Sequence, residues 1–218
     1  KCTFEPMKSL QLIFRYIKYL FRARSKHSAQ APFLYELITQ VIDKTTDDNS
    51  CKNIEALRKE LCTQERIIKI TDFGAGSTIN NSKTRKVKDV AKNSAKNAKF
   101  GKLLYRIIQF YKPKNILELG TSLGISTSYL AKADANAHVF TFEGCPETAK
   151  IAQENFDKQN ITNTYITLGD FNLTLTEKLK EIETVDLAFI DGNHQEKPTI
   201  AYFEECLKYA NNNTIFIF

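Results

Sequence analysis

The sequence predicts an α/β fold in which helices cover both faces of a doubly wound parallel sheet. From Asn115 onward, short apolar segments alternate with segments that can form helices. This alternation is typical of parallel sheets covered on both faces. A glycine turn directly follows the first apolar segment, and acidic residues follow three of the others. Ligands bind at the carboxyl ends of the strands in such sheets, so we expect the functional site there.

The individual elements follow from the apolar runs and their boundaries. We expect strands at residues 115–119, 138–142, 164–168, 185–190 and 214–218. We expect helices at residues 125–133, 146–159, 174–182 and 196–209, and Pro146 suits a helix start. The chain stops within the fifth predicted strand, so we interpret the sheet domain as C-terminally incomplete.

A helical and loop segment, residues 1–84, precedes the predicted sheet domain, residues 85–218. Apolar residues recur at three- and four-residue spacing from Leu10 to Arg24, which predicts a helix with a basic opposite face. Further helices are expected at 32–42 and 53–61. The first helix could pack on its own domain, pack on a second subunit of a homodimer, or lie on an anionic membrane through residues 8–24. We favour packing, and the frequent charges exclude a membrane span.

The net charge of +6 is concentrated in two segments. Residues 1–30 carry seven Lys or Arg against one Glu, and residues 83–102 carry eight against one Asp. Lys88, Lys92 and Lys96 recur at helical spacing, with Lys99 beyond them, and predict a lysine stripe on one helix face. Such a stripe can bind nucleic-acid phosphates. No aromatic platform accompanies it, so we favour a solvated face and expect no nucleic-acid partner.

The chain contains five cysteines, which lie far apart and form no C-x-x-C motif. This pattern disfavours both a disulfide framework and a zinc site. It fits a protein of the reducing cytoplasm. The 42% apolar and 26% charged residues are ordinary values for a globular protein.

The glycine turn after the first strand indicates what the ligand is. Gly120 and Gly124 depart from the dinucleotide spacing G-x-G-x-x-G. Glu118, at the end of the strand, would repel a pyrophosphate and attract ammonium or sulfonium charge. The turn therefore favours S-adenosylmethionine (SAM) over NAD. The remaining cofactor-binding candidates in this turn and in the helix after it are Thr121, Ser122 and Ser126.

Acidic residues at the next two strand ends extend the predicted cofactor site. Glu143 stands 25 residues after Glu118, where a carboxylate can accept both ribose hydroxyl groups, and Gly144 follows it. Gly169 and Asp170 follow the third strand, where the carboxylate can accept the adenine amino group. Phe171 can pack on the adenine ring.

The fourth strand ends in Asp191-Gly-Asn-His194, which we predict to be the catalytic segment. Asp191 could orient an acceptor hydroxyl, or could ligate a divalent cation such as Mg²⁺ that lowers the pKa of that hydroxyl. His194 could act as a general base near neutral pH or line the cofactor pocket.

A second glycine turn, Asp72-x-Gly74-x-Gly76, also follows an apolar run and competes for the cofactor. No acid-terminated strand follows it at the expected distance, so we reject it as the main site. Two interpretations stay open for this segment: a plain turn, or a loop beside the cofactor.

The sequence ILELGTSLGIST (116–127), the turn from Glu143 to Pro146, Gly169-Asp170 and FIDGNH (189–194) together resemble class I SAM-dependent methyltransferases. The O-methyltransferase-like branch with an FIDG-x-H motif, common among bacterial proteins, is the most similar. The resemblance implies a Rossmann-like sheet and methylation of a hydroxyl on a small-molecule acceptor. In metal-dependent members, further carboxylate ligands follow the fifth strand, so we expect no complete metal site in this chain. Two alternatives stay open: an RNA methyltransferase that uses residues 83–102, and a SAM-binding module without catalysis.

Overall fold

The computed structural model describes residues 14–19, 31–71, 84–94 and 97–218. The chain divides into two compact units, residues 1–44 and 45–218, and each is considered by itself. The second glycine turn and most of the first predicted helix lie outside the described residues. The boundary at Thr45 lies before the predicted one at 84/85.

In the first unit, residues 14–19 are helical, as predicted for this part of 10–24. The helix predicted at 32–42 is two successive pieces, α2 (Pro32–Glu36) and a π-helix, η2 (Leu37–Ile42). Pro32 lies in the first turn, where its missing N–H costs no hydrogen bond. Phe14, Tyr16 and Tyr19 are largely exposed.

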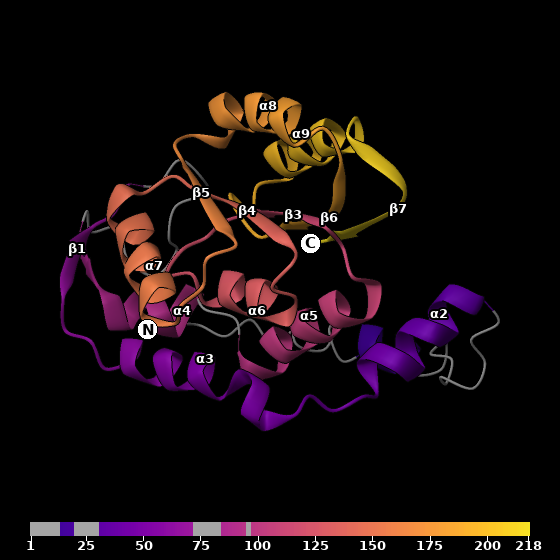
Figure 1. The fold of residues 1–218 in the computed structure, drawn as a ribbon, viewed down its shortest axis with the longest axis horizontal. Helices are drawn as coiled ribbons and strands as arrows, with labels where there is room; N and C mark the ends of the chain where they lie inside the picture. Colours follow the sequence, from indigo (N-terminus) through magenta and orange to yellow (C-terminus); the bar gives the residue numbers. More distant parts are fainter. Residues whose placement is uncertain (1–13, 20–30, 72–83, 95–96) are drawn as a thin grey trace. The chain divides into compact units, whose positions relative to one another are not determined.

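The second unit contains the predicted parallel sheet, in the order β5-β4-β3-β6-β7 (Figure 1). Its strands are β3 (Asn115–Leu119), β4 (His138–Glu143), β5 (Thr164–Leu168), β6 (Val185–Ile190) and β7 (Ala210–Ile217). All four pairings are parallel, which confirms the Rossmann-like fold class. β7 begins before the predicted residue 214. Its first half is asparagine-rich and exposed, so the apolar pattern marks only its second half.

Helices cover both faces of this sheet, as predicted (Figure 1). α8 (Phe171–Ile182) and α9 (Glu196–Leu207) lie on one face, and α5 (Ala98–Tyr111), α6 (Ile125–Ala133) and α7 (Pro146–Lys158) lie on the other. α8 begins three residues earlier than the predicted 174. The Asp170 side chain accepts a hydrogen bond from the backbone N–H of Asn172 (2.9 Å), which caps the helix there.

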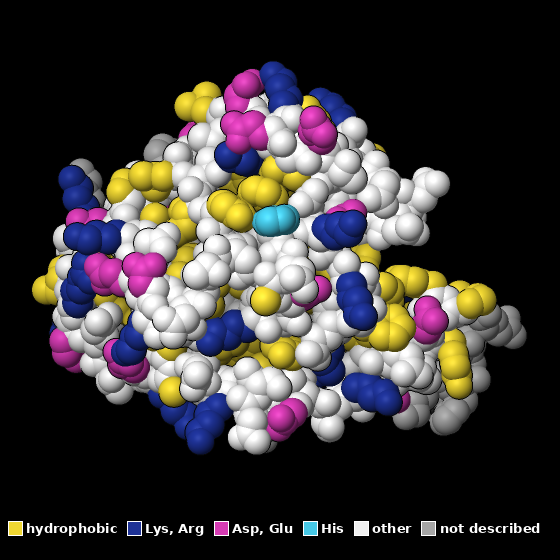
Figure 2. Space-filling view, in the orientation of Figure 1, with side chains coloured by type: hydrophobic (Ala, Val, Ile, Leu, Met, Phe, Trp, Pro, Cys, Tyr) yellow, Lys and Arg dark blue, Asp and Glu magenta, His cyan; other side chains and the backbone are white. Residues whose placement is uncertain are grey.

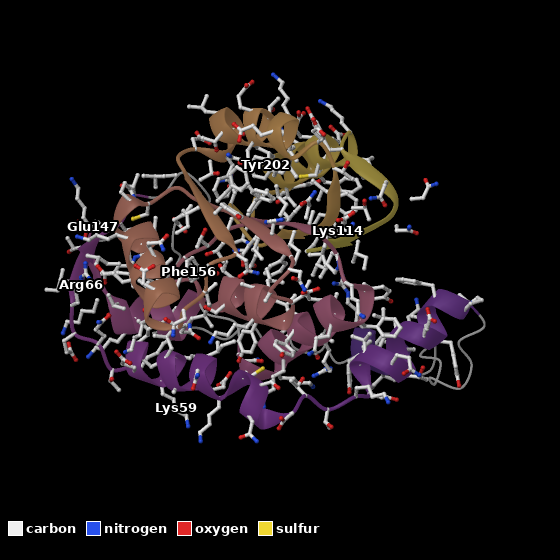
Figure 3. The ribbon with its side chains drawn as sticks, viewed as in Figure 1. Lys59, Arg66, Lys114, Glu147, Phe156 and Tyr202 are labelled. Carbon is white, nitrogen blue, oxygen red and sulfur yellow. The ribbon has the colours of Figure 1, made fainter. Side chains whose placement is uncertain are left out.

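The segment that precedes the sheet, from residue 45 onward, belongs to the second unit. It comprises α3 (Asp48–Leu61), a hairpin of β1 (Ile67–Lys69) and β2 (Thr84–Lys86), and α4 (Val87–Ser94). Ile54, Leu61 and Ile68 share a buried cluster with Tyr129 of α6 and Ile151 of α7. A second cluster lies between the sheet and the pair α8–α9, where Figure 3 shows Tyr202 directed inward.

The helix expected along the lysine stripe is interrupted. α4 ends at Ser94, and α5 begins at Ala98 with Asn97 as its cap, because the Asn97 side chain accepts the N–H of Phe100 (3.1 Å). The lysines therefore do not share one continuous helix. Lys88 and Lys86 both form ion pairs with Glu65.

Within the described residues, no helix combines the length and apolar character that a membrane span requires. Cys51, Cys62, Cys145 and Cys206 are free thiols.

Candidate cofactor and active site

Three strand ends meet at the carboxyl edge of the sheet, as the sequence predicts. Leu119 of β3 is in register with Phe142 of β4 on one side and with Ile190 of β6 on the other. The turns that begin at Gly120, Glu143 and Asp191 therefore lie next to one another (Figure 1).

The turn after β3 approaches its neighbours so closely that glycine is required. Gly120 has φ +108°, and a Cβ atom there would lie 2.7 Å from the carbonyl oxygen of Asp191. The backbone N–H groups of Gly120 and Thr121 both donate to the carbonyl oxygen of Phe142, at 3.0 Å. The turn is thus fixed to β4 and packed against the loop after β6.

The same turn leads into α6 through a second glycine. Gly124 has φ +78° and is the N-cap of α6. A Cβ atom there would lie 2.6 Å from the ring of Phe156, which Figure 3 shows directed inward from α7. The turn is therefore confined from both sides, and it brings the N-terminus of α6 to the carboxyl edge of the sheet.

Glu118 lies beneath this turn and has no exposed surface. Its Oε2 atom accepts hydrogen bonds from the hydroxyl groups of Thr127 (2.5 Å) and Thr141 (2.7 Å). Thr141 in turn lies 2.6 Å from the hydroxyl of Thr121. Burial raises the pKa of the Glu118 carboxyl to about 7, the Asp191 charge adds to the rise, and the hydroxyls of Ser126, Thr127 and Thr141 oppose it.

Glu143 joins the turns of β3 and β4. One carboxylate oxygen accepts the N–H of Ser122 (2.7 Å), and the other accepts the N–H of Cys145 (2.8 Å). Burial raises the pKa of Glu143, while these N–H groups, that of Gly144 and the Thr148 hydroxyl lower it. The residue is partly exposed, and a carboxylate oxygen can accept more than one hydrogen bond. Its oxygens are thus oriented and still have capacity for ribose hydroxyl groups.

The residues after β5 contribute mainly to packing and helix capping. Gly169 has φ +137° and donates its N–H to the carbonyl oxygen of Glu143 (2.9 Å). Asp170 Oδ1 caps α8 by accepting from Asn172. The Phe171 ring is edge-on to Phe142 (6.2 Å between centroids) and partly buried. The adenine contacts of Asp170 and Phe171 stay predictions.

The loop after β6 is tightly held at its start. The Asp191 N–H donates to the carbonyl oxygen of Leu119 (2.9 Å). A Cβ atom at Gly192 would lie 2.6 Å from the Phe171 ring. Asn193 and His194 both have left-handed backbones, with φ +67° and +51°. Asp191 is partly buried and His194 is exposed, so the loop leads from the sheet edge to solvent.

Asp191 was predicted as a tentative metal ligand. The part of the chain that the structure describes contains no group of three or more His, Cys, Asp or Glu residues able to hold a metal ion. The described residues therefore do not by themselves make a metal site, and metal ligation by Asp191 stays a prediction.

The sequence analysis missed Thr141, Thr127 and Tyr202. Thr141 is in register with Glu118 on the neighbouring strand, so its position depends on strand pairing. A polar residue inside the apolar run HVFTF was the available signal. Tyr202 of α9 accepts a hydrogen bond from the Asn193 side chain (3.1 Å), a contact that sequence spacing does not indicate.

Comparison with known proteins agrees with this geometry. Residues 117–218 match a family described as a methyltransferase domain. A catechol O-methyltransferase of Niastella koreensis is 33% identical over 120 residues, which cover 54% of this chain and 53% of that protein. A catechol O-methyltransferase of Mus musculus is 28% identical over 111 residues, covering 49% and 42%. The chain thus spans about half the length of these curated relatives.

Solved structures show the same fold. An O-methyltransferase from Bacillus cereus, in complex with SAH, has a TM-score of 0.53 and 21% identity and covers 86% of this chain and 71% of that chain. An SAH-bound methyltransferase from Podospora anserina has a TM-score of 0.56 and 18% identity, covering 89% and 70%. Residues 117–218 thus match a methyltransferase domain family, and the sheet order and these solved structures show that the chain has a class I methyltransferase fold.

Proposed function

We propose that the protein binds SAM and transfers its methyl group to a hydroxyl oxygen of a small molecule. The proposal rests on one observation above all. The backbone at Gly120, the tethered carboxylate of Glu143 and the loop from Asp191 to His194 lie at adjacent strand ends of one sheet. The candidate cofactor-binding groups and the candidate catalytic groups therefore share one edge, which supports the proposal.

The residues present suit SAM. Glu143 offers partly exposed carboxylate oxygens, which can accept the ribose hydroxyl groups. The Cβ side of Gly120 is filled by the backbone of Asp191, so the turn after β3 lies directly against the loop that carries the candidate catalytic residues. The buried Glu118 and the partly buried Asp191 are both acidic residues at this edge, which favours a sulfonium cation over a pyrophosphate.

For the chemistry, bound SAM supplies the sulfonium methyl group. As the acceptor oxygen forms its bond to that methyl group, the methyl–sulfur bond breaks and SAH is released, and the acceptor hydroxyl must lose its proton. His194 is exposed and lies on the same loop as Asp191, so its imidazole can take the proton. Asp191, held by its own backbone to β3, can orient the acceptor hydroxyl.

The RNA methyltransferase alternative has less support. Its basic segment is split between α4 and α5, and Lys86 and Lys88 are paired with Glu65. Figure 2 shows basic and acidic side chains interspersed on the left of the face drawn. Arg66 with Glu154 and Lys158 with Glu60 form two such pairs. We therefore expect no strong positive field for a phosphate backbone.

Calorimetric titration of the chain with SAM, SAH and NAD tests the cofactor. We expect binding of SAM and SAH and none of NAD. A transfer assay with radiolabelled SAM then uses catechol as the first acceptor probe, because two curated relatives are catechol O-methyltransferases. Binding of NAD, or of neither SAM nor SAH, would overturn the proposal. Tight SAM binding without transfer to any hydroxyl probe would favour the non-catalytic alternative.

A further inference from the structure

The loop from Asp191 to His194 has an unusual backbone. Asn193 and His194 are consecutive non-glycine residues with left-handed φ angles of +67° and +51°. Such conformations cost roughly 1–2 kcal/mol per residue for most side chains, although Asn and His tolerate them better than others. Strained backbone persists only where surrounding structure holds it in place.

The first half of this loop is held by backbone packing. The Asp191 N–H donates to Leu119, and Gly192 is confined by the Phe171 ring and by the Leu119 carbonyl group, which a Cβ atom would approach to 3.1 Å. The His194 N–H donates to the carbonyl oxygen of Gly192 (2.9 Å), which closes a tight turn. These contacts hold the chain as far as Gly192, and the turn hydrogen bond spans Asn193, whose side chain makes a further contact.

The Asn193 side chain is anchored to α9. Its Nδ2 atom donates to the Tyr202 hydroxyl at 3.1 Å. Tyr202 is only 3% exposed, and its ring is edge-on to Phe171, at 5.8 Å between centroids. The anchor is therefore rigid, because Tyr202 is fixed within the core between the sheet and α8–α9. Figure 3 shows its inward direction.

A second feature of Asn193 indicates that its orientation is imposed. Its Oδ1 atom is buried and has no hydrogen-bond partner among the described residues. An unsatisfied buried polar atom costs about 1–3 kcal/mol. In the observed orientation the Asn193 side chain donates to Tyr202 while its own oxygen stays unpaired, so the contact with Tyr202 is the one side-chain hydrogen bond of Asn193 among the described residues.

We infer that Tyr202 and Asn193 are a pair of positioning residues, which hold the loop in its left-handed form and so set where the His194 imidazole lies. Neither residue needs to touch a substrate. Their effect on catalysis rests on the proposed function, whereas their effect on the position of His194 does not.

Proton NMR of the histidine rings tests the pair directly, because the chain has three histidines. His194→Gln and His138→Gln assign the two relevant signals. We expect Tyr202→Phe, which removes only the hydroxyl, to move the His194 signal and leave that of His138 in place. Tyr165→Phe is the matched control, since the Tyr165 hydroxyl lies 3.4 Å from His138 Nδ1. It should move the His138 signal and not that of His194.

Variants on the loop side separate positioning from general loss of stability. Asn193→Ala breaks the same hydrogen bond without touching the core, so it decides the question if Tyr202→Phe fails to fold. Asn193→Asp tolerates a left-handed backbone and can accept from the tyrosine hydroxyl, so its transfer to the catechol probe should stay closer to the wild-type value than that of Asn193→Ala. The double variant Tyr202→Phe/Asn193→Ala should move the signal no further than either single change.

Binding and transfer complete the test. We expect all these variants to bind SAH like the wild type, while transfer to the catechol probe falls about 10–100-fold in Tyr202→Phe and Asn193→Ala. A His194 signal that neither variant moves would overturn the inference. A wild-type chain that binds neither SAM nor SAH would overturn the proposed function instead, and the NMR result would still decide whether the pair positions the loop.

Discussion

A Cβ atom at Gly120 would lie 2.7 Å from the carbonyl oxygen of Asp191, so the turn after β3 and the loop after β6 pack backbone against backbone. The predicted cofactor turn and the predicted catalytic loop are thus in direct backbone contact. A change in either must displace the other, because backbone atoms cannot rotate away as a flexible side chain can.

This contact predicts different behaviour for the two glycines of the turn. Gly120→Ala should destabilise the protein by about 1–3 kcal/mol and abolish SAM binding, because the clash is with backbone and φ is +108°. Gly124→Ala clashes instead with the Phe156 side chain. Adding Phe156→Leu should recover part of the stability lost in Gly124→Ala. It should recover none of the stability lost in Gly120→Ala.

Urea unfolding and SAH titration of the two single and two double variants check this prediction. The Phe156→Leu single variant is the necessary reference, since it loses packing of its own. Equal recovery in both double variants would mean that the clash at Gly120 is not with the backbone of Asp191.

Glu143→Gln should be as damaging as Glu143→Ala for SAM binding, although it is usually a mild change. Both carboxylate oxygens accept backbone N–H groups, from Ser122 and Cys145, and an amide nitrogen cannot accept. We expect both variants to lose roughly 1–3 kcal/mol of binding free energy by calorimetry. Glu147, which is exposed in the first turn of α7, supplies the control variant Glu147→Gln, which should bind SAM like the wild type. Wild-type SAM affinity in Glu143→Gln would contradict the expectation that both carboxylate oxygens must accept backbone N–H groups.

The buried Glu118 predicts a specific pH dependence of stability. Burial raises its pKa to about 7 in the folded protein, whereas the unfolded chain releases the proton near pH 4.3. Between these values the folded state binds more protons, so the stability that Glu118 contributes is complete below about pH 4 and is lost as the pH rises through 7. In Glu118→Gln this loss is absent.

Urea unfolding of the wild type and of Glu118→Gln from pH 5 to pH 8 measures this effect. The free energy of unfolding of the wild type should fall relative to the variant by roughly 1–3 kcal/mol over that range. A difference between the two proteins that does not change with pH would show that Glu118 is already ionised at pH 5.

Asp191→Asn should separate catalysis from cofactor binding. The backbone of Asp191 is fixed to Leu119, so the variant keeps the loop while losing the charge. We expect most of the transfer to the catechol probe to be lost and SAM affinity to be largely kept. His194→Ala should lose less than Asp191→Asn, since general-base assistance is typically worth about 10²–10⁴-fold. Single-turnover transfer, with and without a chelator, measures both variants and also whether a metal contributes. An unchanged rate in Asp191→Asn would place the catalytic group elsewhere.

The sequence by itself determined the sheet and the strand ends at which the candidate site is proposed. Buried parallel strands such as Asn115–Leu119 and Val185–Ile190 are continuous apolar runs, and glycine or proline marks where several of them end or helices begin. The local residue pattern is sufficient for this, because alternating strands and helices predict that neighbouring strands run parallel. The same local pattern predicted that the strands carrying Glu118, Glu143 and Asp191 end at one edge of the sheet.

Only the tertiary structure decided what these residues contact. That Glu118 is enclosed by Thr127 and Thr141 depends on the register between β3 and β4, and that Asn193 reaches Tyr202 depends on how α9 packs. The inclusion of α3 in the second unit depends on shared core packing in the same way. Such contacts join residues distant in the chain, so their energies depend on the assembled fold and leave no periodic signal in the sequence.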